Sequence, residues 1–228
     1  MKKWMIGLMA VLVFTGVSVS GSAQSYVKLN GLYALAGVIN PAVEFTLSPH
    51  STFQTELVIS PWSSIKHNGV NKPMLFGIFL NEYRYYFKQH NSGWYIGANF
   101  GMMAFNMTKP TFSGGQLGFK NTSAKGYGFM GGIVGGYEWR FKEKWILDAF
   151  FGFAYTNSRY NGYALVDGVV EGGHVYNKGE IIMTPHRSEQ PEHPDPWNGS
   201  AEWLPNKIGV SIGILINDPH KRKGRAQQ

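Results

Sequence analysis

Apolar and polar side chains alternate along most of this chain, which is the pattern of β-strands with one apolar and one polar face. In the segment 206–216, isoleucine or valine occupies every second position from Ile208 to Ile216, and the opposite face carries Lys207, Gly209, Ser211 and Gly213. The pattern predicts eight strands, an even number that is typical of bacterial single-chain β-barrels. The predicted strands are 26–36, 42–48, 52–62, 74–87, 93–107, 125–141, 144–156 and 206–216.

Short and long connections alternate between these strands. The second strand joins the third through PHS, the fourth joins the fifth through KQHNS, and the sixth joins the seventh through KE. The connections between them, at 63–73, 108–124 and 157–205, are long, and only the first connection, near GVINP, departs from the alternation. Outer-membrane barrels with both termini in the periplasm have short periplasmic turns and longer extracellular loops. A Greek-key sandwich has no reason to show this alternation.

The charged residues of the predicted strands nearly all fall on one face. In FLNEYRYYF, at 79–87, Tyr83 and Tyr85 alternate with Glu82 and Arg84. In a barrel, the aromatic side chains then face lipid and the charges face the interior, where they must be paired or hydrogen-bonded. We predict an ion-pair network that fills a narrow interior, with Lys207 at the opposite end from the rest. The predicted members are Lys28, Glu44, Glu56, Glu82, Arg84, Glu138, Arg140, Asp148 and Lys207.

Aromatic residues cluster beside the short turns, as in the belts at the interface between a bilayer and water. The same parity also turns three apolar side chains of the fourth strand inward, Met74, Phe76 and Ile78, against the general pattern. The predicted periplasmic belt consists of Phe87, Trp94, Trp139, Phe141 and Trp145.

The composition narrows the fold class. Glycine is abundant, with 29 residues, and aromatic residues make up 15% of the chain. Charged residues also make up only 15%, against about 25% in average proteins. Together with many short strands, this composition leaves a soluble β-sandwich or an outer-membrane barrel. The alternating connections favour an all-β, eight-stranded antiparallel up-and-down transmembrane β-barrel.

The two ends of the chain are expected to lie outside the barrel. A positive start, an apolar segment from Trp4 to Phe14 and small residues after it are typical of a secretory signal peptide, here 1–23, which is removed. The barrel is expected at 24–216 and a basic periplasmic tail at 217–228. The chain has no cysteine, which excludes a disulfide framework and a lipoprotein signal.

The formal net charge of +7 does not indicate a nucleic-acid-binding surface. Lys2 and Lys3 belong to the expected signal peptide, and the tail contains KRKGR, so the segment 24–216 is close to neutral. Binding to nucleic acid is therefore not expected.

Several segments resemble a known family. LNGLYAL, NPAVEFTLSP, ISPW, NEYRYYF and GGYEWRFKEKWILDAFFGFAY occur in this order. They resemble an uncharacterised family of small bacterial outer-membrane β-barrels, chiefly Bacteroidetes-type, that carry a domain of unknown function. The resemblance covers most of 27–156 and the last strand, and it implies a fold and an outer-membrane location but no activity. The matching residues are Pro41, Glu44, Pro61, Trp62, Glu82, Arg84, Tyr85, Tyr137 and Trp139, whereas Asn81 stands where the family has proline.

A lipid-modifying enzyme is a further hypothesis, because some outer-membrane barrels carry a serine–histidine–acid site on the wall. Here the histidines fall in turns, loops or the tail, so no catalytic residue is predicted. Glu56 and Glu82 are interpreted as members of a structural ion-pair network rather than an acid/base pair. GGIVGG at 131–136 lacks the lysine and the helix of a phosphate-binding loop. No cofactor and no metal ion are predicted.

The connection 157–205 contains HRSEQPEHPDPW, a candidate interaction site. Its spacing fits no zinc-binding template, and its prolines are typical of a polar loop. The candidate ligand-contacting residues are His186, Glu189, Glu192, His193 and Asp195.

The sequence thus predicts an outer-membrane protein of structural or surface-interaction type, with its specificity in the extracellular segments 108–124 and 157–205. Expected partners are outer-membrane lipid, the barrel-assembly machinery during biogenesis and an extracellular ligand. The alternative is a narrow channel or transporter for small or apolar solutes.

Overall fold

The computed structural model describes residues 24–62, 65–67, 70–113, 116–142, 144–166, 170–171, 174–175, 180–183 and 198–217. The expected signal peptide at 1–23 lies outside these ranges, and so does the expected basic tail, except for Asn217.

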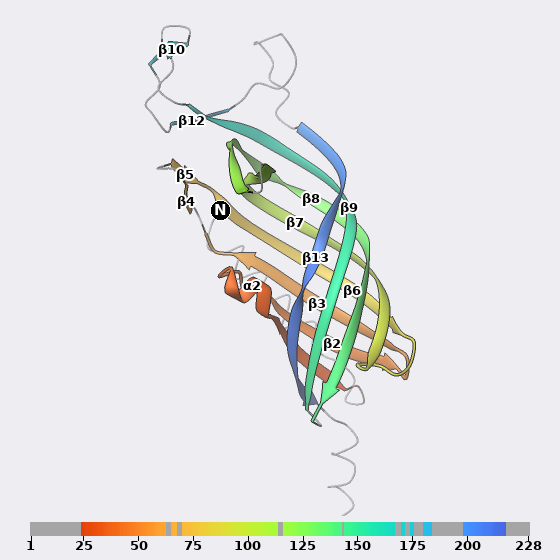
Figure 1. Cartoon of the computed structure of the whole chain (residues 1–228). Helices are drawn as coiled ribbons and strands as arrows, with labels where there is room; N and C mark the ends of the chain where they lie inside the picture. The colour runs from red at the N-terminus through yellow and green to blue at the C-terminus, as the bar shows by residue number, and fades with distance from the viewer. Residues whose placement is uncertain are drawn as a thin grey trace, which may run out of the picture.

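Eight antiparallel strands form one sheet that closes on itself (Figure 1). Each strand pairs with the next of the eight along the chain, and the last pairs with the first. The predicted eight-stranded up-and-down barrel is therefore confirmed. The strands are β1 (Ser25–Asn30), β2 (Pro41–Ser48), β3 (Ser51–Ser60), β6 (Met74–Tyr86), β7 (Gly93–Ser113), β8 (Gln116–Phe141), β9 (Trp145–Val166) and β13 (Asn198–Asn217).

Shorter strands lie at the end of the barrel opposite the tight turns (Figure 1). β4 (Ile65–His67) pairs with β5 (Val70–Lys72), and β10 (Val170–Glu171) pairs with β11 (His174–Val175). β12 (Glu180–Met183) pairs with the far part of β9. The barrel thus continues on this side into small sheets.

Two segments predicted as loops are partly strand. β7 continues to Ser113 and β8 begins at Gln116, so most of 108–124 extends their hairpin. β9 reaches Val166 and β13 begins at Asn198, which shortens the predicted 157–205 loop. The apolar alternation stops before these strands end, because polar residues occupy both faces there, whereas main-chain pairing does not depend on side-chain polarity.

The segment 31–36, predicted as part of the first strand, instead contains the short helix α2 (Gly31–Leu35). Asn30 caps it, because its Oδ1 accepts a hydrogen bond from the Leu32 main-chain N at 3.0 Å. The chain then turns at Gly37, whose φ of +67° suits glycine. Among the described residues, no helix is long and apolar enough to cross a membrane.

Burial is inverted relative to a soluble globular protein. Lys28 and Arg84 are 1% and 0% exposed, whereas Trp94 and Ile133 are 65% and 66% exposed. Along most of the barrel the polar positions point to the interior and the apolar positions point outward, as the parity of the sequence predicts, and the inward apolar residues Met74, Phe76 and Ile78 of β6 are exceptions. The interior therefore holds the residues with chemistry to consider.

Glycines on the inner face allow neighbouring groups to approach closely. A Cβ atom at Gly136 would lie 2.5 Å from Tyr95 Oη, and one at Gly101 would lie 2.7 Å from Leu80 Cδ2. The space over these glycines is therefore filled by the side chains of Tyr95 and Leu80, which keeps the interior narrow.

Candidate functional site

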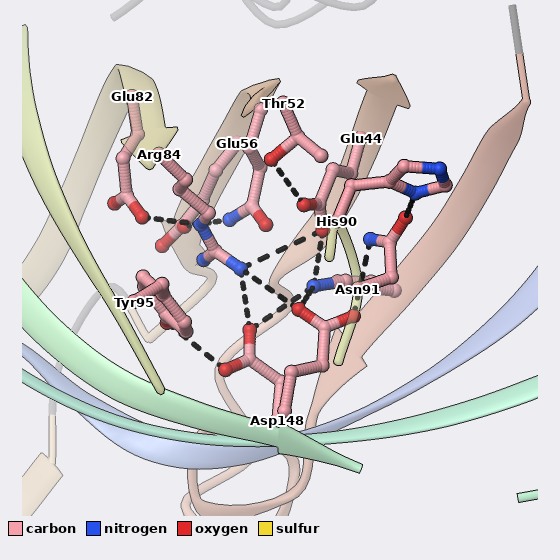
Figure 2. A network of polar contacts seen from close by, with 12 residues as sticks. Glu44, Thr52, Glu56, Glu82, Arg84, His90, Asn91, Tyr95 and Asp148 are labelled. Carbon is pink, nitrogen blue, oxygen red and sulfur yellow. Dashed lines mark hydrogen bonds and ion pairs between the residues drawn. The ribbon is translucent and has the colours of Figure 1, made fainter. Parts of the chain in front are cut away.

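Charged side chains converge inside the barrel near the tight turns (Figure 2). Eight of the nine residues that the sequence places in the interior meet here, and each is at most 4% exposed. They come from seven of the eight barrel strands, all except β7, so their contacts cross the barrel rather than follow its wall. The eight residues, named here the charge network, are Lys28, Glu44, Glu56, Glu82, Arg84, Glu138, Asp148 and Lys207.

Lys28 on β1 is a centre of the charge network. Its Nζ forms an ion pair with Glu44, lies 3.0 Å from Asp148 Oδ2 and lies 3.2 Å from Glu138 Oε2. An ammonium has three donors, so three carboxyl groups match its capacity. Glu138 and Asp148 belong to β8 and β9, which do not pair with β1, so these contacts join strands across the interior.

Arg84 on β6 is the second centre. Its Nε donates to Glu82 Oε1 at 2.5 Å, and one terminal nitrogen, Nη1, donates to Asp148 Oδ2 at 2.7 Å. The guanidinium carbon lies 4.5 Å from the centre of the Tyr95 ring, a cation–π contact with β7. Arg84 thus links β6, β7 and β9.

Lys207 on β13 also belongs to the charge network, although the sequence placed it at the opposite end. Its Nζ lies 2.7 Å from Glu56 Oε2 and 2.6 Å from Glu82 Oε2. A register shift between Pro205 and Lys207 alters the pairing of β13 at this point, and the long lysine side chain extends towards the acids. Neither effect can be read from the alternation of residues.

Arg140 is the one predicted member that does not join the charge network. It is exposed near the end of β8, and its Nη2 donates to the His90 carbonyl at 3.1 Å. Its parity points inward, but it lies beside the β6–β7 turn, where an exposed guanidinium avoids the cost of burial and binds the main chain.

Neutral donors complete the charge network, and sequence reasoning missed them. Tyr86 and Tyr95 share the inward parity of the charged residues, which was the available signal. Tyr95 Oη donates to Asp148 Oδ1 at 2.9 Å, and Thr52 Oγ1 donates to Glu44 Oε1 at 2.5 Å. With Tyr95, every one of the eight strands contributes a group. Among the further donors, Asn40 and Gln54 both donate to Glu56, and Asn91 donates to Glu138.

The charge network holds five carboxyl groups and three cations. Tyr86 Oη lies 2.6 Å from Glu138 Oε2 and 2.9 Å from Glu44 Oε1. A phenol carries one proton, so it can donate fully to only one of these oxygens. A proton on one of the two carboxyl groups would satisfy the second short contact. We expect one proton to be held between Glu44 and Glu138, which would reduce the excess of negative charge.

A histidine borders the charge network at the β6–β7 turn. His90 Nδ1 lies 2.9 Å from Asn91 Oδ1, and Asn91 Nδ2 donates to Glu138 Oε1 at 3.2 Å. Burial lowers the pKa of His90 from its usual value, and the nearby positive charge of Arg140 acts in the same direction. The neutral imidazole is therefore favoured in the folded protein.

The charge network cross-links the strands of the barrel. Each carboxyl group contacts a cation, and their interactions lie in a nearly solvent-free interior. Among the described residues, no group of three or more histidine, cysteine or acidic side chains could hold a metal ion. The candidate loop residues His186, Glu189, Glu192, His193 and Asp195 lie outside the described residues.

The outer surface beside the turns carries exposed aromatic residues. A surface pocket of about 420 Å³ is lined by Phe87, Lys88, Gly93, Trp94 and Tyr137. The rings of Trp94 and Tyr137 meet edge to face, with centroids 5.1 Å apart. The five residues of the predicted belt are all exposed on this surface: Phe87, Trp94, Trp139, Phe141 and Trp145.

Fold and site together define a class: a small up-and-down β-barrel with apolar outward positions and an interior crossed by ion pairs. The chain belongs to the family described as "Protein of unknown function (DUF3575)", whose model matches residues 7–181. No curated protein matches the chain, and no solved structure matches it.

Proposed function

We propose that the protein is an outer-membrane β-barrel of structural or surface-interaction type. One observation carries this proposal: the most buried side chains include Arg84, Lys28 and Lys207, while large apolar side chains cover the outside. Soluble proteins rarely expose large contiguous apolar surfaces. A barrel in lipid requires this arrangement, because apolar residues then face hydrocarbon.

The height of the apolar surface supports a membrane location. On β7 the outward apolar positions run from Trp94 to Ala104, and on β9 they run from Trp145 to Tyr155. Each run covers about 11 residues, close to the roughly 9–11 residues with which a tilted strand crosses a bilayer. Asn157 follows on the same face of β9 and is exposed.

The charge network supports a structural role in preference to a channel. Its ion pairs join strands that do not pair with each other, and the pair of Lys207 with Glu82 joins two strands on opposite sides of the ring, so these side chains occupy the passage through which a solute would have to move. In this proposal the specificity lies in the segments 108–124 and 157–205, beyond the apolar surface, and the protein performs no catalytic step. Its partners are then outer-membrane lipid, the barrel-assembly machinery during biogenesis and an extracellular ligand.

Fractionation of a Gram-negative host that expresses the full chain tests the location. We expect recovery in the outer-membrane fraction and a shift in gel migration between unheated and boiled samples, because barrels stay folded in detergent until they are heated. Recovery in the soluble periplasm without such a shift would overturn the proposal.

A further inference from the structure

The polarity of the inner face changes abruptly along β6 and β7. Glu82 pairs with Asn99, and the next inward pair is Leu80 with Gly101. Beyond that level the inward pairs are apolar. They are Ile78 with Met103, Phe76 with Phe105, and Met74 with Met107, without a shift in register. Directly opposite residues share a face of the sheet, so these side chains all belong to the interior.

Packing contacts support this placement. Ile78 and Met103 pack against a buried cluster of Leu80, Met130 and Ala154 from β6, β8 and β9. Phe105 on β7 and Tyr160 on β9 have ring centroids 6.4 Å apart, although β8 lies between their strands. Gly126 permits this contact, because its missing Cβ would lie 2.6 Å from Tyr160 Cβ. We name the inward residues 74, 76, 78, 103, 105, 107 and 130 the methionine-rich face.

The methionine-rich face is apolar, whereas the interior of a transmembrane barrel is usually polar. Phe76, Ile78, Met103 and Phe105 are only half-buried, so they retain surface for contact with another molecule. Methionine is flexible and polarizable and is frequent on surfaces that bind varied apolar ligands. Burial of this remaining surface by hydrocarbon is favourable.

The border between the charge network and the methionine-rich face holds unused hydrogen-bonding groups. Asn206 Nδ2 donates to Asn99 Oδ1 at 2.8 Å. The other halves of both amides, Asn99 Nδ2 and Asn206 Oδ1, are buried without a hydrogen-bond partner among the described residues. Asn99 is only 4% exposed. An unpartnered donor and an unpartnered acceptor on two amides that are hydrogen-bonded to each other suit a small head group that both accepts and donates a hydrogen bond.

We infer that the methionine-rich face binds a single-chain amphiphile, with its hydrocarbon tail along β6–β8 and its small neutral head at Asn99 and Asn206. A protonated fatty acid or a fatty alcohol has this chemistry. The buried polar side chains of Thr156 and Ser158 on the neighbouring strand β9, where Thr156 pairs with Met130, limit the apolar surface on that side. The ligand sits above the charge network, which forms the floor of the site.

Photolabelling of the full chain in lipid nanodiscs with palmitic acid that carries a diazirine in its tail tests this inference. We expect saturable labelling of inward residues such as Met103 and Phe105, which unlabelled palmitic acid suppresses. Labelling of the outward neighbour Met102 should be neither saturable nor competed, because it reports surrounding lipid. The labelling of Met102 therefore tests the membrane proposal, and the saturable labelling of Met103 and Phe105 tests the ligand site independently of it.

Matched variants sharpen the test. Met103→Gln should weaken saturable labelling about tenfold, because a polar amide then faces the tail, whereas Met102→Gln should leave it unchanged. Heat-modifiable gel migration shows whether each variant is folded. Labelling is then compared at Phe105 in the folded fraction, because Phe105 is unchanged in both variants. Labelling confined to outward residues, or inward labelling that palmitic acid does not suppress, would overturn the inference. Equal competition by hexadecane and palmitic acid would overturn the role of Asn99 and Asn206.

Discussion

Glu138 on β8 and Asp148 on β9 face each other directly across their two strands, and both contact the ammonium of Lys28. Like charges in this position destabilise a sheet. The pair is tolerated because Lys28 lies between the two carboxyl groups and Tyr86 binds Glu138 at 2.6 Å. The two acids are nevertheless not equivalent, since Asp148 accepts hydrogen bonds from Arg84 and Tyr95, whereas Arg84 Nη1 lies 3.6 Å from Glu138 Oε2.

Neutralising the two acids should have different effects on stability. Asp148→Asn removes a carboxylate that lies 3.0 Å from Lys28 Nζ and 2.7 Å from Arg84 Nη1, so we expect a loss of about 3–5 kcal/mol in the free energy of unfolding. Glu138→Gln should cost less than about 1 kcal/mol, because the proton between Glu44 and Glu138 already reduces its charge. Urea unfolding in micelles, followed by tryptophan fluorescence, measures both. Equal losses would contradict the shared proton.

Removing Lys28 should also destabilise the barrel strongly. Lys28→Met leaves Glu44, Glu138 and Asp148 close together without their central cation, and we expect a loss of about 3–5 kcal/mol. Lys125→Met is the matched control, because Lys125 is exposed near the far end of β8. The same urea titration compares the two, and similar stability in both variants would show that the charge network does not hold the barrel together.

The charge network should keep the interior closed to ions. In planar bilayers we expect no channels of defined unitary conductance from the full-length protein. Arg84→Ala removes the contacts with Glu82 and Asp148, so any conductance should appear only in that variant. Channels in the unaltered protein whose size changes with Arg84→Ala or Glu82→Gln would instead identify the interior as a pathway.

Acidification should weaken the β6–β7 turn through His90. Its pKa is lower in the folded protein than the usual 6.5, mainly because of burial. The unfolded chain therefore binds a proton more readily, and stability falls as the pH drops below about 6.5. The effect should be small, because the side chain is partly exposed and screened by solvent. Urea midpoints at pH 7.5 and 5.5 should differ less in His90→Gln than in the unaltered protein.

A charged side chain on the outward face should prevent folding into a membrane only if it lies within the apolar surface. Ile133→Lys places an ammonium on the outside of β8, and we expect a cost of about 2–4 kcal/mol in a bilayer. Asn157→Lys changes an outward residue beyond that surface and should fold normally. Heat-modifiable migration after refolding into liposomes reports the folded fraction. Efficient folding of Ile133→Lys would argue for an aqueous surrounding.

The sequence is sufficient to predict the ring of strands and the inward side of Glu82 and Arg84, because both follow from the two-residue period of a strand. It does not predict contacts across the barrel. Lys207 meets Glu56 and Glu82 through a register shift in β13, and Arg140 turns to the His90 carbonyl. Both outcomes depend on how strands are staggered, and residue alternation contains no information about stagger.

The helix α2 shows a second limit. LNGLYAL has the apolar residues of a strand, yet the Asn30 side chain caps a helical turn and the strand ends there. Local hydrogen bonding by asparagine competes with main-chain pairing, so hydrophobic pattern alone places this boundary wrongly. The inward Met74, Phe76 and Ile78, by contrast, were visible as exceptions to the pattern, and they coincide with the methionine-rich face.

The origin of the cations has a consequence for assembly. Lys28 comes from the first strand and Lys207 from the last, and these two strands form the seam that closes the ring. Their acidic partners Glu56, Glu82 and Glu138 lie on strands between them. Before β13 joins the sheet, Lys207 is missing from the interior. Glu56 then lacks its contact with Lys207, and Glu82 keeps only its contact with Arg84. The ring closes in the same step in which Lys207 reaches its acidic partners. A barrel that lacks β13 is therefore less stable, because it holds acidic side chains in its interior without this counter-charge.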